Sequence, residues 1–373
     1  MSQPPRRGIV AAGHDAAADA AAAMLDVGGN AFDAAVAAGF ASAVCEPGFT
    51  SLAGGGFLLA RPAGGADILF DFFVDTPGRG RAEGAPAPVF EEVTVAFAAA
   101  TQTFHCGPGS VAVPGVLAGY LHVHDRLGRL PLAEVVAPAA RLATDGVAVS
   151  PSQAIDLALL APILARTAAS RAIFFPDGDL LGAGETLRNP DLGRFLTDLG
   201  ADAGAAFYDG DLARRLVDQL AEGGGLLTLE DLAAYRVVER RPRRATYRGR
   251  TLVTNPPPSF GGALLSVALG RLERLGPPAP PGSVEWALAV AGVMADVDAG
   301  RAAGDPEVVA ALAGDPAELG EPGDPGEPGE DATGRPVATR GTTHVTVADA
   351  EGNVAAMTTS NGECSGDVVD GTG

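Results

Sequence analysis

The chain has 373 residues, of which 47% are hydrophobic, and its 26 arginines stand against 46 Asp and Glu residues with no lysine, which gives a formal charge of −20. This apolar content is enough for the core of one large domain or two smaller ones, and it excludes an intrinsically disordered protein. The negative charge would repel phosphate groups, so we expect neither nucleic acid nor a membrane surface as a partner.

The amino terminus and the cysteines predict a cytoplasmic protein. Two arginines precede an alanine-rich stretch, but His14, Asp15 and Asp19 interrupt the apolar core that a signal peptide requires, and no segment is apolar enough to span a membrane. The three cysteines are odd in number and lack metal-ligand spacing, so we expect no disulfide framework. We also expect no metal ion and no cofactor.

The first hundred residues alternate helix and strand signals. Residues 14–27 are alanine-rich and end at two glycines, which stop a helix. Asn30 then caps a second helix, with Asp33 at its third position, that runs until Pro47. The segments FLLARP and DILFDFFV predict a hairpin.

The middle of the chain is mainly helical, and it ends in a linker. Helices are expected near residues 113–127, 131–145, 150–168, 189–200, 210–222, 229–235, 263–275 and 283–303, with a strand pair near residues 235–255. Residues 314–341 are rich in Gly, Pro, Asp and Glu, which predicts a flexible, solvated linker.

Beyond the linker, a period of two residues predicts a β-strand. In GTTHVTV, alternate residues from Thr343 to Val347 would face one side, whereas Thr342, His344 and Thr346 would face the other. The segment DAEGN supplies a turn, and VAAMTTSN returns as a second strand. Thr342 would therefore begin an edge of a β-hairpin, at the point where the linker ends.

Thr342 becomes a candidate nucleophile if the chain is cut in front of it. An internal threonine hydroxyl is a poor nucleophile because its proton lacks an acceptor. Cleavage of the Gly341–Thr342 bond would place an α-amino group, with a pKa of roughly 8, beside the hydroxyl as a general base. Gly341 presents no side chain against an N-to-O acyl shift. The string taken alone favours the alternative, an ordinary strand with a polar face.

Five blocks in a fixed order resemble the γ-glutamyltransferase (γ-glutamyl transpeptidase) family, from about Gly8 to Gly373. They are GGNAFDAAVAAGFASAVCEPGFTSLAGGGF, VAVPGVLAGY, GGLLTLEDLAAYRVVERRP, YRGRTLVTNPPPSFGG and GTTHVTVADAEGNVAAMTTSNG. The resemblance implies an α+β fold, the αββα sandwich of amino-terminal-nucleophile hydrolases with an added helical region. It also implies self-cleavage into a large subunit, residues 1–341, and a small subunit that begins with residues 342–373, the two forming a heterodimer.

The resemblance also implies roles for individual residues. Thr342 would attack the γ-carbonyl of a γ-glutamyl compound such as glutathione, and the acyl group would pass to water or to an amino acid or peptide acceptor. The hydroxyl that hydrogen-bonds the nucleophile falls on Thr359 or, if residues are counted without a gap, on Ser360. Asn361 would contact the α-carboxylate or amine of the glutamyl group.

The sequence departs from this family pattern at two places. Phe73 stands where characterised transpeptidases carry an arginine for the substrate α-carboxylate, and a phenyl ring cannot replace a bidentate guanidinium, although Arg79 or Arg81 could substitute. The family's small subunit continues beyond Gly373, with further strands, a serine pair and a glycine pair. We therefore expect a C-terminally incomplete fold, and the alternative function is a catalytically inactive, truncated remnant.

Three other features are weaker candidates for a functional site. His122 and His124 are two residues apart on an expected helix and would point in different directions, so we expect a solvated surface there and no metal site. Adjacency of His105 and Cys106 does not make a nucleophile–base pair. The basic run ERRPRRATYRGR is interpreted as a solvated hairpin in an acidic protein.

Overall fold

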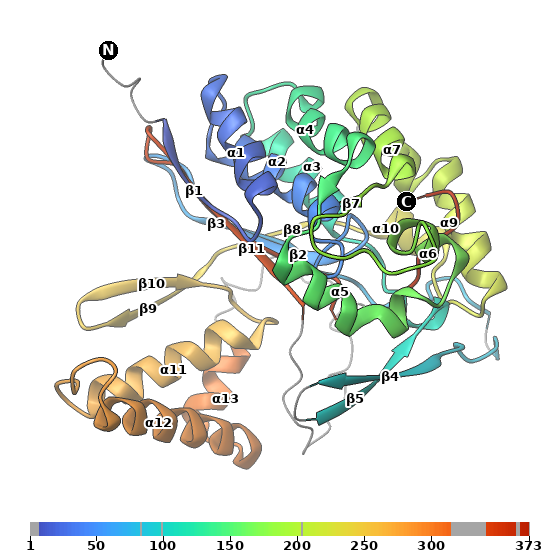
Figure 1. Ribbon diagram of the computed structural model, residues 1–373. Helices are drawn as coiled ribbons and strands as arrows, with labels where there is room; N and C mark the ends of the chain where they lie inside the picture. The colour runs from blue at the N-terminus through green and yellow to red at the C-terminus, as the bar shows by residue number, and fades with distance from the viewer. Residues whose placement is uncertain are drawn as a thin grey trace. The chain divides into compact units, whose positions relative to one another are not determined.

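The chain divides into two units, shown in the computed structural model of Figure 1. The first comprises Met1–Gly64, Asp71–Val237 and Glu330–Gly373, and the second comprises Gly65–Phe70 and Val238–Gly329. The structure describes residues 7–82, 84–97, 100–202, 204–314, 341–362 and 366–372. Except for its terminal residues, Gly314 and Gly341, the predicted linker lies outside the described residues.

The sheet of the first unit is organised around β11 (Thr343–Asp349). On one side, β1 (Gly8–Ala11) pairs antiparallel with β11; on the other, β12 (Val354–Ser360) pairs with β11, and β2 (Gly55–Arg61) pairs with β12. Strand β11 thus lies between β1 and β12, but β1 pairs only with Thr346–Asp349, so among the described residues Thr343–Val345, next to Thr342, pair with β12 alone. The sequence did not predict β1, because a four-residue strand is too short to show a period of its own.

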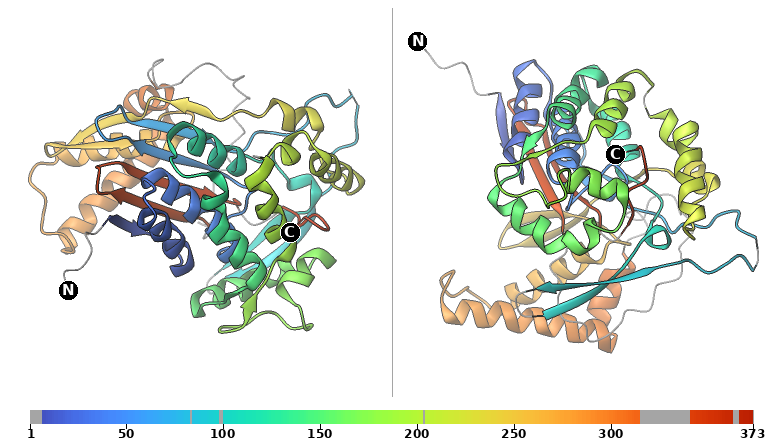
Figure 2. Two further views of the ribbon diagram at one scale, coloured as in Figure 1. Left: turned by 90° about the horizontal axis from the view of Figure 1, so that it is seen from above. Right: turned by 45° about the vertical axis from the view of Figure 1, so that its right-hand side comes forward.

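Helix α2 (Ala31–Cys45) is buried along its whole length and packs on β11 and β12. Asn30 and Asp33 form the predicted capping box at its first turn. In both views of Figure 2 the blue helices of residues 15–45 lie against the red hairpin of residues 343–360. Small residues permit this approach: a Cβ at Gly39 would lie 2.5 Å from Tyr120 Cζ and 2.7 Å from Met357 Cε.

Further helices and short strands complete the first unit. The predicted helices are present, and the hairpin of β4 and β5 was not predicted. The elements are α1 (Asp15–Asp26), β4 (Glu91–Phe97), β5 (Ala100–Cys106), α3 (Val116–Leu127), α4 (Leu132–Asp145), β6 (Val147–Ala148), α5 (Pro151–Leu164), α6 (Ala168–Phe174), β7 (Thr186–Leu187), α7 (Pro190–Asp202), α8 (Ala205–Tyr208), α9 (Asp211–Glu222) and α10 (Leu229–Ala234).

The second unit has its own hairpin and a small helical core. Strand β3 (Ile68–Phe72) crosses the boundary between the units, and β9 pairs antiparallel with β10. Valines from the three helices form the core, Val267, Val293, Val297 and Val308. The elements are β8 (Val238–Arg240), β9 (Arg243–Tyr247), β10 (Arg250–Thr254), α11 (Phe260–Arg274), α12 (Val284–Ala303) and α13 (Pro306–Ala313).

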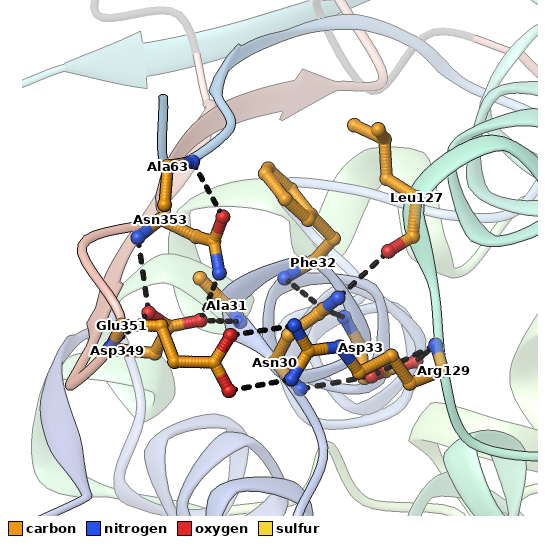
Figure 3. A network of polar contacts seen from close by, with 10 residues as sticks. All are labelled: Asn30, Ala31, Phe32, Asp33, Ala63, Leu127, Arg129, Asp349, Glu351 and Asn353. Atoms are coloured by element: carbon orange, nitrogen blue, oxygen red, sulfur yellow. Dashed lines mark hydrogen bonds and ion pairs between the residues drawn. The ribbon is translucent and has the colours of Figure 1, made fainter. Parts of the chain in front are cut away.

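A polar network fastens the turn between β11 and β12 to the start of α2 (Figure 3). The carboxylate of Asp349 accepts a hydrogen bond of 3.0 Å from the Ala31 N–H and one of 2.7 Å from the Asn353 amide. Two hydrogen bonds of 2.6 Å join the Arg129 guanidinium to the Glu351 carboxylate. A carboxylate at a helix N-terminus is favourable because it meets unpaired N–H groups and the positive end of the helix dipole.

Asp33 is the buried centre of the same network, with 0% of its surface exposed. Its carboxylate accepts hydrogen bonds from three backbone N–H groups, those of Asn30 at 2.9 Å, Arg129 at 3.0 Å and Leu130 at 3.2 Å. It therefore joins the first turn of α2 to the loop after α3.

We expect Asp33→Ala to lower the free energy of unfolding by about 3 kcal/mol, because each buried N–H that loses its partner costs about 1–3 kcal/mol. Urea denaturation followed by circular dichroism measures this change. The control is Asp19→Ala at an exposed position of α1, where we expect a change within about 0.5 kcal/mol. Equal stability of the two variants would contradict the role given to Asp33.

Candidate active site

Three hydroxyl and carbonyl groups form a relay at the start of β11. The Thr342 hydroxyl, which is exposed, donates to Ser360 Oγ over 3.2 Å, and the Ser360 hydroxyl donates to the Gly341 carbonyl oxygen over 2.9 Å. The Gly362 N–H donates to Ser360 Oγ over 2.9 Å and holds that hydroxyl in place. One serine therefore contacts both the candidate nucleophile and the carbonyl of the peptide in front of it.

Thr359, the alternative partner from the family resemblance, lies on the other face of β12. Its side chain is buried, and its Oγ1 accepts a hydrogen bond of 3.0 Å from the Thr50 hydroxyl. Alternation along the strand explains the difference, because neighbouring residues point to opposite faces. The contact with Thr342 is therefore made by Ser360.

Asn361 is held by the loop of residues 46–54. Its backbone N–H donates to Phe49 O over 2.9 Å, its side-chain amide donates to Pro47 O over 3.2 Å, and its Oδ1 accepts from the Ser51 hydroxyl over 2.7 Å. The loop thus fixes the segment that follows Ser360. Sequence reasoning did not single out the hydroxyls of Thr50 and Ser51.

The same loop packs against both residues that flank Thr342. The Glu46 carboxylate, in a residue only 5% exposed, accepts a hydrogen bond of 3.0 Å from the Thr343 hydroxyl. A Cβ at Gly341 would lie 2.8 Å from Phe49 Cδ1, so no side chain fits there without a shift of the ring. Sequence reasoning missed Glu46, because a single glutamate 297 residues from its partner carries no local signal.

A small cavity adjoins this loop. Its volume is about 20 Å³, and its lining includes Pro47, Gly48, Phe49, Val149 and Leu157. That volume is close to the space of one water molecule, so the cavity as it stands does not hold an acyl group.

Desolvation shifts the pKa of two titratable side chains in or near these elements. Desolvation lowers the pKa of His344, whose ring nitrogens lie 2.7 Å from Thr358 Oγ1 and 3.0 Å from Thr346 Oγ1. Burial, with a smaller effect from the Glu46 charge, raises the pKa of the Cys45 thiol.

Two other histidines that the sequence analysis considered contact a backbone carbonyl and a glutamate. His124 Nε2 lies 2.8 Å from the Leu130 carbonyl oxygen, and His105 Nε2 lies 3.7 Å from Glu92. Within the described ranges, no group of three or more His, Cys, Asp or Glu side chains could hold a metal ion. No helix in the part of the chain that the structure describes is long and apolar enough to cross a bilayer.

Comparisons with known proteins agree on one family. The gamma-glutamyltranspeptidase family profile matches residues 17–373. The acylase ACY 1 proenzyme of Pseudomonas sp. (strain SE83) is 36% identical over 368 residues, which cover 94% of this chain and 65% of the relative. The glutathione hydrolase proenzyme of Escherichia coli (strain K12) is 36% identical over 274 residues, 72% of this chain and 45% of the relative.

A solved structure extends the likeness to three dimensions. The crystal structure of Helicobacter pylori gamma-glutamyltranspeptidase matches with a TM-score of 0.69 and 28% identity, over 81% of this chain and 85% of that one. This match confirms the expected α+β fold. The chain spans 45–65% of the length of the two curated relatives.

We expect the His344 ring to titrate below its ordinary pKa of about 6.5. Because burial disfavours the imidazolium, the unfolded chain binds a proton more readily than the folded one, so stability is full above pH ~6.5 and falls as the pH drops below it. NMR titration of the imidazole protons, assigned with a His344→Gln variant, measures the midpoint. A midpoint above 6.5 would contradict the burial effect.

Proposed function

The chain belongs to the γ-glutamyltranspeptidase family, and from this premise we propose that it performs amide acyl transfer or hydrolysis through Thr342, exposed as an N-terminal residue by self-cleavage. Residues 1–341 would then be the large-subunit region, with residues 314–341 as the linker before the cut, and residues 342–373 would begin the small subunit. Glutathione-type γ-glutamyl compounds are the first donor class to test, with water or an amino acid or peptide amine as acceptor. Other amides are the second, since one relative is an acylase.

The relay from Thr342 through Ser360 to the Gly341 carbonyl carries this proposal. Thr342 Oγ1 attacks the Gly341 carbonyl carbon and passes its proton to Ser360 Oγ, while the Ser360 proton moves to the carbonyl oxygen. The C–N bond then breaks, the nitrogen takes up the proton, and an ester joins Gly341 to the Thr342 side chain. Water hydrolyses this ester and leaves a Gly341 carboxylate and a free Thr342 α-amine.

The same residues support the second reaction. The α-amine can accept the proton of its own hydroxyl, directly or through a water molecule, when Thr342 attacks a substrate amide. Thr343, the residue after the nucleophile, is anchored by its hydrogen bond to buried Glu46. Thr342 would therefore stay in place after the bond in front of it is cut. Attack on the substrate gives an acyl-threonine ester, which water or an amine resolves.

We expect purified protein to convert into fragments of residues 1–341 and 342–373, which intact-mass spectrometry detects. Thr342→Ala should abolish the fragments because it removes the attacking hydroxyl, whereas Thr342→Ser should still produce them. An uncut wild-type chain would overturn the proposal. If the protein is cut but does not hydrolyse a γ-glutamyl anilide, the assignment of Thr342 as nucleophile stands and the γ-glutamyl donor class is excluded.

Ser360→Ala should slow the cut by about 10- to 100-fold, since it removes one hydrogen bond to the scissile carbonyl, worth about 1.5–3 kcal/mol in the transition state. The rate is measured from the fragment ratio over time after purification. Thr358→Ala is the matched control, because it removes a hydroxyl from the same face of β12 that contacts His344 and not the relay. Equal rates in the two variants would exclude Ser360 from the cleavage step.

A further inference from the structure

Resting on the proposed function, we propose that the acyl group transferred to Thr342 is an uncharged aromatic or aliphatic chain, bound on the stacked rings of Phe57 and Phe73. This narrows the two donor classes to amides of apolar acids. The inference depends on where the ring pair lies, on how it is held, and on the charges around it.

The strand register places the ring pair on the face of the sheet that carries the nucleophile. Ser360 pairs with Gly55, and Thr358 pairs with Phe57. Thr342 continues the register of β11 opposite Ser360, which its hydroxyl contacts. Directly paired residues share a face, so Thr342, Ser360 and Phe57 point the same way, with β2 two strand spacings, roughly 10 Å, from β11. A medium-length acyl chain spans that distance.

The Phe73 ring is held in place by its neighbours and remains open to solvent. Its ring centroid lies 5.6 Å from that of Phe57, with the two planes 16° apart, yet Phe73 is 53% exposed. Its backbone N–H donates to the Asp71 carboxylate over 3.1 Å, and its carbonyl accepts from the Tyr235 hydroxyl over 2.7 Å. A flat, rigid pair of rings that is open to solvent favours apolar ligand groups and costs little entropy on binding.

Gly55 brings this segment close to the relay. A Cβ at Gly55 would lie 2.8 Å from Val74 N and 3.3 Å from the Phe73 carbonyl carbon. The chain after β3 therefore passes directly beside the strand position that pairs with Ser360. The backbone that carries Phe73 is thus packed against the residue that pairs with Ser360.

Charges near Phe73 disfavour the α-carboxylate of a γ-glutamyl group. Burial raises the pKa of Asp75, the Arg79 charge lowers it, and the charges of Asp71 and Asp231 raise it by smaller amounts, so three carboxylates and one guanidinium lie close together here. The two arginines that the sequence offered as substitutes have local partners: Arg79 counters the rise at Asp75, and Arg81 donates to the Pro86 carbonyl. The α-carboxylate of a glutamyl group would add a fourth carboxylate to these three aspartates and would be repelled.

Isothermal titration calorimetry on the wild-type protein tests the inference with two product acids, 4-phenylbutyrate and L-glutamate, which are not turned over. We expect 4-phenylbutyrate to bind at least tenfold more tightly than L-glutamate. Phe73→Arg should weaken 4-phenylbutyrate at least tenfold and strengthen L-glutamate, while Phe73→Leu should keep the order of preference. Phe90→Arg, at another exposed phenylalanine, is the matched control and should leave both affinities unchanged.

The outcomes separate this inference from the proposed function. Tighter binding of L-glutamate, or no effect of Phe73→Arg on 4-phenylbutyrate in a variant with a wild-type circular dichroism spectrum, overturns the inference. Intact-mass spectrometry of the same sample reports the cut independently. If the protein is cut and prefers L-glutamate, the proposal that Thr342 is the nucleophile stands and the apolar donor class is excluded.

Discussion

The hydrogen bond between the Thr343 hydroxyl and the buried Glu46 carboxylate is the constraint on which the site depends. Because side chains alternate along a strand, fixing Thr343 toward the helices turns Thr342 to the opposite face. There Thr342 meets Ser360, and Ser360 meets the carbonyl of Gly341. If the acceptor for Thr343 lay on the opposite face of the sheet, Thr343 would point to that face and Thr342 would point toward the buried face.

Features set by neighbouring residues could be predicted from the sequence. The capping box of Asn30 and Asp33 lies within four residues, and the alternation in β11 and the turn at Asp349 are equally local. Pairings between distant segments could not be predicted from the sequence. β1 gives too few residues to show a period, and only its pairing with Thr346 to Asp349 makes β11 an interior strand.

The choice between Thr359 and Ser360 shows the same limit at the site. A count along the chain allowed either, and the face of the strand decides which one reaches Thr342. Glu46 and Ser51 belong to a loop whose partners lie about 300 residues away, so sequence reasoning could not predict what its side chains hold. For Phe73, the sequence showed that a phenylalanine replaces the family arginine. It did not show that this ring stacks on Phe57.

The interior position of β11 bears on what a severed backbone would expose. A break between Gly341 and Thr342 would fall just before the first strand pair of β11, which joins Thr343 to Thr359, and β1 pairs only with the later residues Thr346 to Asp349. Neither set of pairs includes Gly341 or Thr342. Cleavage at this bond would therefore create two chain ends and leave the pairing of β11 with both of its neighbours unchanged.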